Sequence, residues 1–295
     1  MQRRQLLVPL LAAPLAALGS CARVQDIDHD GEHAPVSLPL NRSFRTAWVL
    51  SSGGPRGFAH VGVLKALTEL GLRPNLLVGA SIGSLAACLY ASGMPAAQME
   101  KLALEFSTLG VVRPHLGSGA EKLSGLGLVD LVNGLLEHRR MEQLPIPVAV
   151  VAMRQDSREL TAFTRGNAGV AIQASCAIEG NFVPVRIRGQ AYVDPDLGAP
   201  MPVRMARALG AQRVLAVDVS AHEDKSPAGS ERYRPGDLRK RALTVPDTKA
   251  ATFTLHPEFS YYVNLGQAFR EAAMRAGYEQ TMAQAGANAA RRAPA

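Results

Sequence analysis

A serine lies between two glycines in the segment Gly79-Ala80-Ser81-Ile82-Gly83. The apolar run 75–78 precedes this segment and the small residues 84–91 follow it, a pattern that predicts a strand, a sharp turn and a helix. On such a turn the serine hydroxyl points away from the chain and can act as a nucleophile. The alternative is an ordinary strand–helix connection, because the pentapeptide alone also arises by chance in chains rich in Gly and Ser.

A glycine-rich loop, residues 52–57 (Ser-Gly-Gly-Pro-Arg-Gly), lies upstream of this serine. It joins a predicted buried strand at 47–51 to a predicted buried helix at 58–67. Successive backbone N–H groups at a helix N-terminus favour negative charge. A phosphate-binding loop is one interpretation, although the lysine and hydroxyl residue of a P-loop are missing, as is the G-x-G-x-x-G spacing.

An oxyanion hole is the other interpretation of this loop, since serine acyl chemistry needs one beside its nucleophile. We expect Gly53 and Gly54 to donate their N–H groups, because glycine lets a substrate come close to the backbone. Each donor stabilises the developing oxyanion by roughly 3 kcal/mol. Pro55 has no N–H to donate. We expect the Arg56 side chain to hold the loop by hydrogen bonds to carbonyl groups, and the alternative is a contact with a substrate phosphate.

The proton acceptor for Ser81 can be a histidine or an aspartate. In an α/β-hydrolase triad the acid and then the histidine follow the serine along the chain. His256 comes after the acidic candidates, so the chain order permits it. The segment Tyr192-Val193-Asp194-Pro195-Asp196 offers a carboxylate instead, which can take the serine proton directly and return it to the leaving group.

Three sequence blocks, taken in order, resemble the patatin-like phospholipase family over roughly residues 45–280. The first block is the glycine loop with the start of the following helix, 52–64. The second is the serine segment 79–83. The third is Tyr192-Val193-Asp194 with its following matches within residues 200–211. Because the three blocks occur together and in order, the resemblance is more specific than any one of them.

The resemblance implies a fold of the α/β class, with three α/β/α layers and a mixed central sheet. It implies a catalytic dyad of Ser81 and Asp194 with no histidine base. It also implies an oxyanion hole from the backbone around Gly53, Gly54 and Arg56. The substrate it implies is a phospholipid or another acyl-ester lipid, cleaved at a carboxylic ester as by a phospholipase A or a lysophospholipase. We expect neither a cofactor nor a metal ion, since no ligand spacing of His and Cys appears.

Several residues depart from the family pattern around the aspartate and the glycine loop. Ser52 stands at the first of three usual glycines, and Pro195 and Asp196 follow Asp194 where Gly-Gly or Gly-Ala is usual. Pro195 fixes its own φ and keeps Asp194 out of the helical region. If the family's glycine has a positive φ, Asp194 would move away from the nucleophile, and about 1 Å of displacement costs roughly 100-fold in rate. The Asp196 carboxylate would also raise the pKa of Asp194.

Glu179 is a further departure, at a place where the family commonly has a Pro-Gly turn beside the substrate pocket. A charge there would narrow or polarise a groove for acyl chains. We expect residues 108–145 to supply the lid or that groove, because loops beside rigid elements carry such roles. The departures keep a second function open, a catalytically weak lipid-binding or envelope-interaction protein of the same fold. A serine peptidase or thioesterase, which shares the serine turn, is a third.

Residues 1–20 have the layout of a signal peptide. Arg3 and Arg4 precede an apolar run, 6–18, that is too short to span a bilayer. The run ends in Leu18-Gly19-Ser20-Cys21, which resembles a bacterial lipobox and implies cleavage before Cys21 and lipidation of that residue. The alternative is a signal peptide without lipidation. We therefore expect a lipid-anchored protein of the bacterial cell envelope, on the periplasmic face of the outer membrane.

The rest of the chain is interpreted as one domain, because no repeat or long linker divides it. We expect a flexible tether at 21–44, a single patatin-like acyl hydrolase domain at 45–285 and a C-terminal tail at 286–295. The hydrophobic content of 47% suffices for a packed core and excludes wholesale disorder.

The chain carries a net charge of +7, which falls to +5 when residues 1–20 and their two arginines are removed. A positive excess suits an anionic membrane surface, and an ordinary basic solvated face is the alternative. The densest basic cluster falls in 226–247, which we expect to be a mobile surface loop that contacts lipid head groups. Its members are Arg232, Arg234, Arg239, Lys240 and Arg241. Nucleic-acid binding is not expected, because no recognised module or alternation of basic and aromatic residues appears.

Overall fold

The computed structural model describes residues 28–115 and 120–290 of the chain. The predictions for the signal peptide, for Cys21 and for the start of the tether lie outside these residues. Across the described residues, no helix combines the length and the apolar character needed to cross a bilayer.

A mixed sheet forms the centre of the described part of the chain. Its nine strands follow the order β1-β8-β9-β6-β3-β2-β10-β11, with β7 paired to β6. They are β1 (Asp28–His29), β2 (Phe44–Leu50), β3 (Leu76–Ala80), β6 (Val148–Arg154), β7 (Leu160–Phe163), β8 (Val185–Ile187), β9 (Gln190–Val193), β10 (Ala211–Val217) and β11 (Phe253–Leu255). Neighbours from β6 to β11 along this order are parallel, as are β1 and β8, whereas β9 runs antiparallel to β6 and β8, and β7 antiparallel to β6. A separate antiparallel pair joins β4 (Arg113–Pro114) and β5 (Leu123–Ser124).

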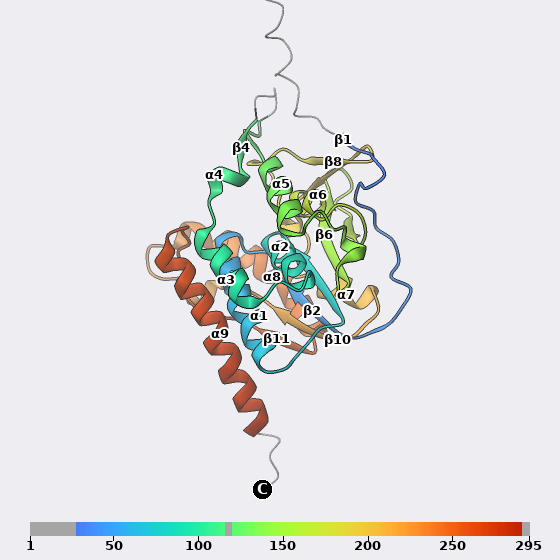
Figure 1. Cartoon of the computed structure of the whole chain (residues 1–295). Helices are drawn as coiled ribbons and strands as arrows, with labels where there is room; N and C mark the ends of the chain where they lie inside the picture. Colours follow the sequence, from blue (N-terminus) through green and yellow to red (C-terminus); the bar gives the residue numbers. More distant parts are fainter. Residues whose placement is uncertain (1–27, 116–119, 291–295) are drawn as a thin grey trace, which may run out of the picture.

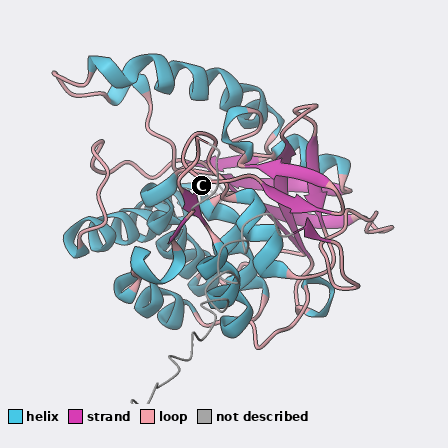
Figure 2. Cartoon of the chain, turned by 90° about the horizontal axis from the view of Figure 1, so that it is seen from above, coloured by secondary structure: helices cyan, strands magenta, loops and turns pink. Residues whose placement is uncertain are grey.

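Helices cover both faces of this sheet. The face that carries Trp48, Leu50 and Leu77 packs on the larger layer. That layer holds α1 (Phe58–Glu69), α2 (Ile82–Ala91), α3 (Ala96–Glu105), α5 (Leu126–Leu135), α6 (Ala168–Ser175) and α9 (Gln267–Ala290). The face with Val49 and Val78 packs on α7 (Val203–Ala208) and on the end of α8 (Arg234–Ala250). Figure 1 shows α9 lying along α1 and α3, and Figure 2 shows the strands gathered together with helices around them. The predicted three-layer α/β/α fold is confirmed.

The carboxyl ends of the central parallel strands meet at one edge of the sheet. In the aligned strands β3, β2 and β10, Val49 lies beside both Val78 and Ala216. β2 leads into the glycine loop, β3 into Ser81, and β10 and β11 into Asp218 and His256. β3 is buried along its whole length, and its sequence is a nearly continuous apolar run. Open α/β sheets bind ligands outside this edge, so the fold gathers the candidate residues where a site is expected.

The N-terminal segment 28–44 differs from the flexible tether that we expected. β1 pairs with β8, with Asp28 opposite Arg186. Ala34 is buried, and the Val36 N–H donates to the Arg165 carbonyl at 3.1 Å. The segment packs there because the edge of the sheet offers backbone groups that need hydrogen-bond partners.

The segment 226–247 also differs from expectation, since its residues from 234 onward form most of α8 and are not a mobile loop. Pro235 lies in the first turn of α8, where a missing N–H costs nothing. Asp247, near the other end, is 1% exposed and accepts hydrogen bonds from the N–H and the guanidinium of Arg204. The loop prediction gave too much weight to Pro and Gly and none to these tertiary contacts. Similarly, the last helix runs to residue 290, past the expected start of the tail.

Candidate active site

Ser81 forms the turn between β3 and α2 and has a positive φ of 51°. That conformation is strained for a residue with a side chain. A Cβ on Gly79 would lie 2.4 Å from Ser84 Cα, and one on Gly83 would lie 2.3 Å from the Leu50 carbonyl oxygen. Strand and helix therefore pack this closely only because both positions are glycine.

The Ser81 hydroxyl donates a hydrogen bond to the Asp194 carboxylate, with an Oγ to Oδ2 distance of 2.6 Å. Both residues are buried: Ser81 is 6% exposed and Asp194 is 4% exposed. Asp194 Oδ1 accepts the Asp196 N–H at 2.9 Å, and the Asp194 N–H donates to the Ala177 carbonyl at 2.9 Å. The structure thus brings the two predicted residues together and holds one carboxylate oxygen toward the serine.

Pro195 does not displace Asp194 from the serine. Asp194 has φ −58° and ψ 130°, the extended conformation that a residue before proline prefers. Pro195 opens the short 3-10 helix η3 (Pro195–Leu197), where its fixed φ suits the first helical position. The Asp-Pro-Asp sequence therefore makes a turn of its own that needs no positive φ.

The pKa of Asp194 is raised to about 7, mainly by burial. The hydrogen bond from Ser81 opposes this rise, the Asp196 carboxylate adds to it, as the sequence predicted, and the Lys240 ammonium opposes it. A general base works best when its pKa lies near the working pH, because it must both accept the proton and return it. Asp194 is therefore suited to proton transfer at neutral pH.

Two of the residues that depart from the family pattern contact each other. The Ser52 hydroxyl donates to Asp196 Oδ1. The same oxygen binds the Lys240 ammonium of α8 at 2.7 Å. One carboxylate thereby links the glycine loop, the turn that carries Asp194, and α8.

The glycine loop folds as the 3-10 helix η1 (Gly54–Gly57) and packs against the start of α2. A Cβ on Gly57 would lie 2.4 Å from Ile82 Cγ2, so the loop closely approaches the residue that follows Ser81. Gly54 has a φ of +53°, which glycine adopts without strain. The backbone of Gly53 and Gly54 thus lies on a loop packed beside the nucleophile, and its role as an oxyanion hole stays a prediction.

The Arg56 side chain holds the glycine loop, as expected from the sequence. Its guanidinium donates from Nε to the Val219 carbonyl at 2.6 Å and from Nη1 to the Ser260 carbonyl at 2.8 Å, and it lies 4.2 Å from the centre of the Phe259 ring. The backbone N–H of Arg56 is already used, because it donates to the Gly53 carbonyl at 3.1 Å across the 3-10 turn. The N–H of Arg56, one of the three expected oxyanion donors, is therefore occupied in this structure.

Ser175 is a site residue that the sequence analysis missed. Its hydroxyl accepts the Ser81 N–H at 2.8 Å and donates to the Val151 carbonyl at 2.6 Å. It therefore ties the strained turn to β6. The available signal was a polar residue at the end of an alanine-rich helix, but nothing in the sequence connects that position with the serine.

An apolar pocket lies next to two residues that contact the dyad, although neither Ser81 nor Asp194 lines it. Its lining includes Cys176, whose thiol contacts Ser81, and Ala177, whose carbonyl accepts the Asp194 N–H. Burial, with a further contribution from the Asp194 charge, raises the pKa of the Cys176 thiol, so this group is inert rather than nucleophilic. The other apolar lining side chains are Val111, Val112, Leu128, Phe182, Val183 and Val185. Several of them come from the stretch 108–145, which we expected to supply an acyl groove.

Glu179 is not among the residues that line this pocket. The Arg158 guanidinium binds its carboxylate at two points, with N to O distances of 2.7 and 2.9 Å. Arg158 lies in the turn between β6 and β7. This two-point ion pair satisfies the carboxylate. The geometry therefore does not support the expectation that Glu179 polarises an acyl groove.

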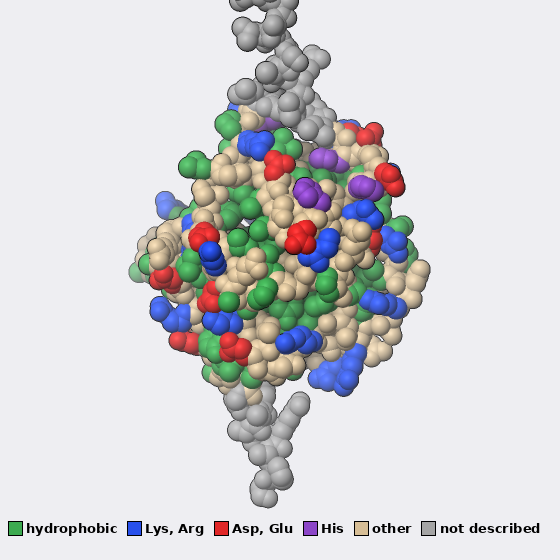
Figure 3. Space-filling view, in the orientation of Figure 1, with side chains coloured by type: hydrophobic (Ala, Val, Ile, Leu, Met, Phe, Trp, Pro, Cys, Tyr) green, Lys and Arg blue, Asp and Glu red, His purple; other side chains and the backbone are tan. Residues whose placement is uncertain are grey.

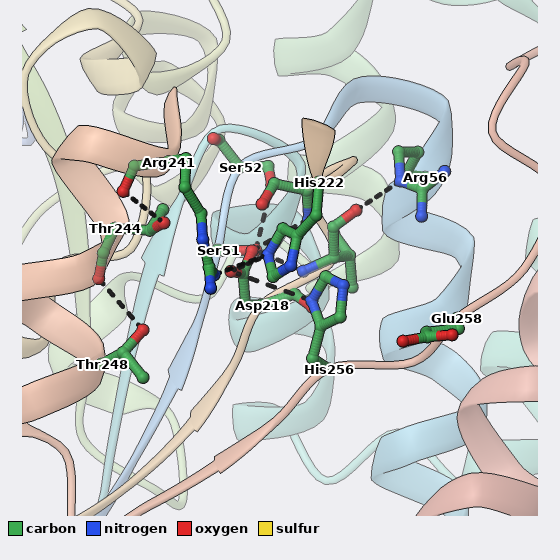
Figure 4. Close-up of polar contacts among 12 residues, drawn as sticks. Ser51, Ser52, Arg56, Asp218, His222, Arg241, Thr244, Thr248, His256 and Glu258 are labelled. Atoms are coloured by element: carbon green, nitrogen blue, oxygen red, sulfur yellow. Dashed lines mark hydrogen bonds and ion pairs between the residues drawn. The ribbon is translucent and has the colours of Figure 1, made fainter. Parts of the chain in front are cut away.

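A cluster of Asp218, His222 and His256 lies at the same edge of the sheet (Figure 4). Its possible ligand atoms lie within 4.8 Å of one another, so a metal site must be considered. However, the two imidazole rings stack at 3.7 Å with an interplanar angle of 12°, and parallel rings do not direct their nitrogens at one ion. Arg241 Nη1 also lies 3.1 Å from His222 Nε2, where its charge would repel a cation. The residues therefore fit a hydrogen-bonded network better than a metal centre.

His256 takes part in that network and not in the contact with Ser81. Its Nδ1–H donates to the Asp218 carbonyl at 2.9 Å. The carboxylate of Asp218 lies 3.3 Å from His222 Nε2, and hydrogen bonds to its ionised form hold its pKa far below the usual range despite burial. Next to it along the chain, the Val219 N–H donates to Ser51 Oγ at 3.0 Å. The cluster therefore holds in place the segment that follows β10, which is bonded to Ser51 next to the glycine loop.

Comparison with known proteins gives consistent matches. A family model described as patatin-like phospholipase matches residues 48–207. An uncharacterised NTE family protein of Mycobacterium tuberculosis is 31% identical over 194 residues, which cover 64% of this chain and 54% of that protein. The human patatin-like phospholipase domain-containing protein 6 is 29% identical over 185 residues, which cover 60% of this chain and 14% of that protein. The chain thus spans about half or less of the length of these curated relatives.

A solved structure supports the fold. The crystal structure of VipD from Legionella pneumophila matches with a TM-score of 0.55 and 15% identity, over 89% of this chain and 70% of that chain. At this identity the likeness concerns the fold alone.

Proposed function

The chain belongs to the patatin-like phospholipase family, and from this premise we propose that it hydrolyses acyl esters of membrane lipids. The 2.6 Å hydrogen bond from Ser81 Oγ to Asp194 Oδ2 is the observation that carries the proposal. It supports Ser81 as the nucleophile and Asp194 as its base, a pair that needs no histidine.

The proposed reaction begins with proton transfer from Ser81 Oγ to Asp194 Oδ2 as the serine oxygen attacks the ester carbonyl carbon. The N–H groups of Gly53 and Gly54 stabilise the negative charge that develops on the carbonyl oxygen. Asp194 then gives the proton to the leaving alcohol, and the acyl group stays on Ser81 as an ester. Water gives a proton to Asp194 as its oxygen attacks the carbonyl carbon of this ester, and Asp194 then returns the proton to Ser81 Oγ as the bond to the acyl group breaks and the fatty acid leaves.

The apolar pocket beside the dyad supports a lipid substrate. Two of its lining residues, Cys176 and Ala177, contact the dyad. Burial of an alkyl chain there contributes about 0.8 kcal/mol per methylene group. We therefore propose this pocket as the place of the acyl chain.

The exposed basic residues around α8 support contact with a membrane surface. Arg232, Arg234 and Arg239 are exposed, together with Tyr233 and Tyr262, whose rings lie 6.4 Å apart. Over the described residues of the face that Figure 3 draws, basic and acidic side chains are interspersed and no basic patch forms. Arginine with tyrosine suits the head-group region of an anionic bilayer. We propose that a lipidated Cys21 holds the domain at such a surface in the bacterial cell envelope.

Hydrolysis of esters by purified full-length protein tests the proposal. We expect cleavage of p-nitrophenyl esters and of a lysophospholipid, and a drop in kcat of roughly 1,000-fold or more in Ser81→Ala and in Asp194→Asn. Ser92→Ala is the matched control, because Ser92 is a buried serine at the end of α2 whose hydroxyl donates to the Leu89 carbonyl at 2.7 Å and not to Asp194. Undiminished turnover in Ser81→Ala would contradict the assignment.

The same assay separates the alternatives left open by the sequence. A catalytically weak lipid-binding protein would show no turnover that depends on Ser81. A peptidase or thioesterase would prefer peptide or thioester substrates in a panel that includes the lipid esters. No structural observation favours either, since Asp194 contacts the serine and Glu179 is held by Arg158.

A further inference from the structure

Two short segments of the chain expose large apolar side chains. Residues 104–109 run from the end of α3 into α4 (Thr108–Val111), and residues 262–265 lie just before α9. Their exposed apolar side chains, here called the apolar rim, are Leu104 at 36%, Leu109 at 91%, Tyr262 at 47%, Val263 at 49% and Leu265 at 38%. Single exposed apolar residues are ordinary on a protein surface, whereas a group of them marks a surface that binds a partner.

Arg270 of α9 holds the two segments against each other. It is 9% exposed, and its Nε donates to the Leu265 carbonyl at 2.9 Å. Its Nη1 donates to the carbonyls of Ala103 at 3.1 Å and Leu104 at 2.8 Å. The end of α3 therefore lies beside the start of α9, as Figure 1 shows. Because one buried guanidinium bonds to both segments, Leu104 and Leu265 lie side by side on one surface.

Aromatic and basic side chains flank the apolar rim. The Tyr262 ring lies 6.4 Å from the Tyr233 ring, and the Arg232 guanidinium lies 4.5 Å from the centre of the Tyr233 ring. Glu105, the acidic residue of the segment 104–109, lies 3.9 Å from the Lys101 ammonium, which offsets its charge. Tyrosine and arginine favour the head-group region of a bilayer, and leucine and valine favour the hydrocarbon below it. The rim therefore matches, in charge and in composition, a bilayer with anionic head groups.

The apolar rim also adjoins the pocket proposed for the acyl chain. Leu109 and Val111 both belong to α4, and Val111 lines that pocket. We propose that the rim inserts into the membrane that carries the substrate, and that its partner is the hydrocarbon region of a bilayer with anionic head groups. The inference rests on the proposed function and goes beyond it, because contact through charge alone needs no penetration.

A tryptophan introduced into the rim tests insertion. The chain has one tryptophan, Trp48, which is 1% exposed, so its emission reports little on the surface. In the full-length protein with Leu109→Trp, vesicles of phosphatidylcholine and phosphatidylglycerol should shift the emission to shorter wavelength. Phospholipids brominated on their acyl chains should quench that emission, because the new side chain then lies among the hydrocarbon tails. Emission that neither shifts nor is quenched would overturn the proposal.

Leu72→Trp is the matched control. Leu72 is 46% exposed, but it precedes β3 and so lies at the opposite edge of the sheet from Ser81. Its variant should show neither the shift nor the quenching. Equal responses of the two variants would overturn the proposal, since they would show that contact with lipid is not confined to the rim. Emission of Leu109→Trp that shifts with protein concentration and without lipid would also overturn it, and would assign the rim to a second copy of the chain.

A comparison of substrates links insertion to turnover. Leu109→Ser should lower the ratio of the rate on phospholipid vesicles to the rate on a soluble p-nitrophenyl ester by roughly tenfold or more, because a leucine is no longer buried in hydrocarbon. Leu72→Ser should leave this ratio as in the parent. If no ester is cleaved at all, the hydrolase proposal fails, and the fluorescence of Leu109→Trp, which needs no turnover, still decides whether the rim inserts.

Discussion

Asp194 combines two properties that conflict at the scale of a single residue. It is 4% exposed and yet must be ionised to accept the serine proton. Burial disfavours the charged form, which is why its pKa is raised to about 7. Burial thus suits Asp194 to the reaction but lowers the free energy of unfolding at neutral pH.

Asp194→Asn should therefore stabilise the protein at neutral pH while it removes activity. The unfolded chain releases this proton near the ordinary pKa of 3.8 and the folded chain only near 7. Between the two values the parent loses stability as the pH rises, because its unfolded state binds fewer protons. The melting temperature of the variant should exceed that of the parent by a margin that grows from about pH 4 to about pH 7 and then stays constant. A margin that does not change with pH would contradict the raised pKa.

Two charged side chains act on the pKa of Asp194 in opposite directions: Asp196 from the same turn, and Lys240 from α8. The Asp196 charge raises the pKa of Asp194, and the Lys240 ammonium on α8 lowers it. In the parent, kcat/KM should rise with pH and level off above about 7. Asp196→Asn should move the midpoint to lower pH, and Lys240→Met should move it to higher pH. Profiles of kcat/KM against pH measure both shifts, and shifts of the same sign would contradict the account.

The junction of β3 and α2 depends on glycine at the scale of elements. A Cβ on Gly83 in α2 would lie 2.3 Å from the Leu50 carbonyl oxygen, which belongs to the neighbouring strand β2. Gly83→Ala should therefore force strand and helix apart and lower the free energy of unfolding by about 3 kcal/mol or more. Denaturant unfolding monitored by circular dichroism measures the loss.

Gly134 provides the matched control, since it is also helical and a Cβ there meets nothing within 4 Å. Gly134→Ala should raise the free energy of unfolding by roughly 0.5–1 kcal/mol through helix propensity alone. Equal effects of the two substitutions would show that close packing at Gly83 is unimportant.

At the scale of the whole molecule, the basic residues around α8 predict binding to anionic vesicles. Binding should increase with the fraction of anionic lipid and weaken as salt is added. The double variant Arg234→Glu and Arg239→Glu should reduce the partition coefficient by roughly tenfold or more, since each charge contributes about 1 kcal/mol. Each of the two single variants is compared with Arg275→Glu, at an exposed residue of α9, which changes the net charge by the same amount. Vesicle sedimentation measures the partition, and equal binding to neutral and anionic vesicles would contradict the prediction.

The sequence predicted those features of the molecule that are encoded locally. The turn at Ser81 follows from glycines within two residues of it, and the strands β2 and β3 follow from apolar runs that are buried on both faces. The order of three motifs then indicated the sheet that carries them. The pairing of Asp194 with Ser81 came from the family resemblance, because the order of residues along the chain did not exclude His256 as the base.

The features that the sequence did not predict arise from contacts between distant segments. Ser175 bonds to a residue 94 positions away, and no local pattern indicates that contact. Residues 234–247 are helical because Asp247 packs on the domain, in spite of two prolines and a glycine in this stretch. Residues 28–44 form hydrogen bonds with the backbone of β8 and of Arg165. Because any sequence with free backbone N–H groups can form such bonds, the side chains do not indicate them.

The hydrogen bond from Ser52 to Asp196 has a consequence for exchanging loops between relatives. A chimera that receives the three-glycine loop of another member loses the hydroxyl and leaves the Asp196 carboxylate with Lys240 as its remaining partner. A chimera that receives only the Asp-Gly-Gly turn leaves both Ser52 and Lys240 without their acceptor. The two segments should therefore tolerate replacement together better than one at a time, and evolution should have changed them as a unit.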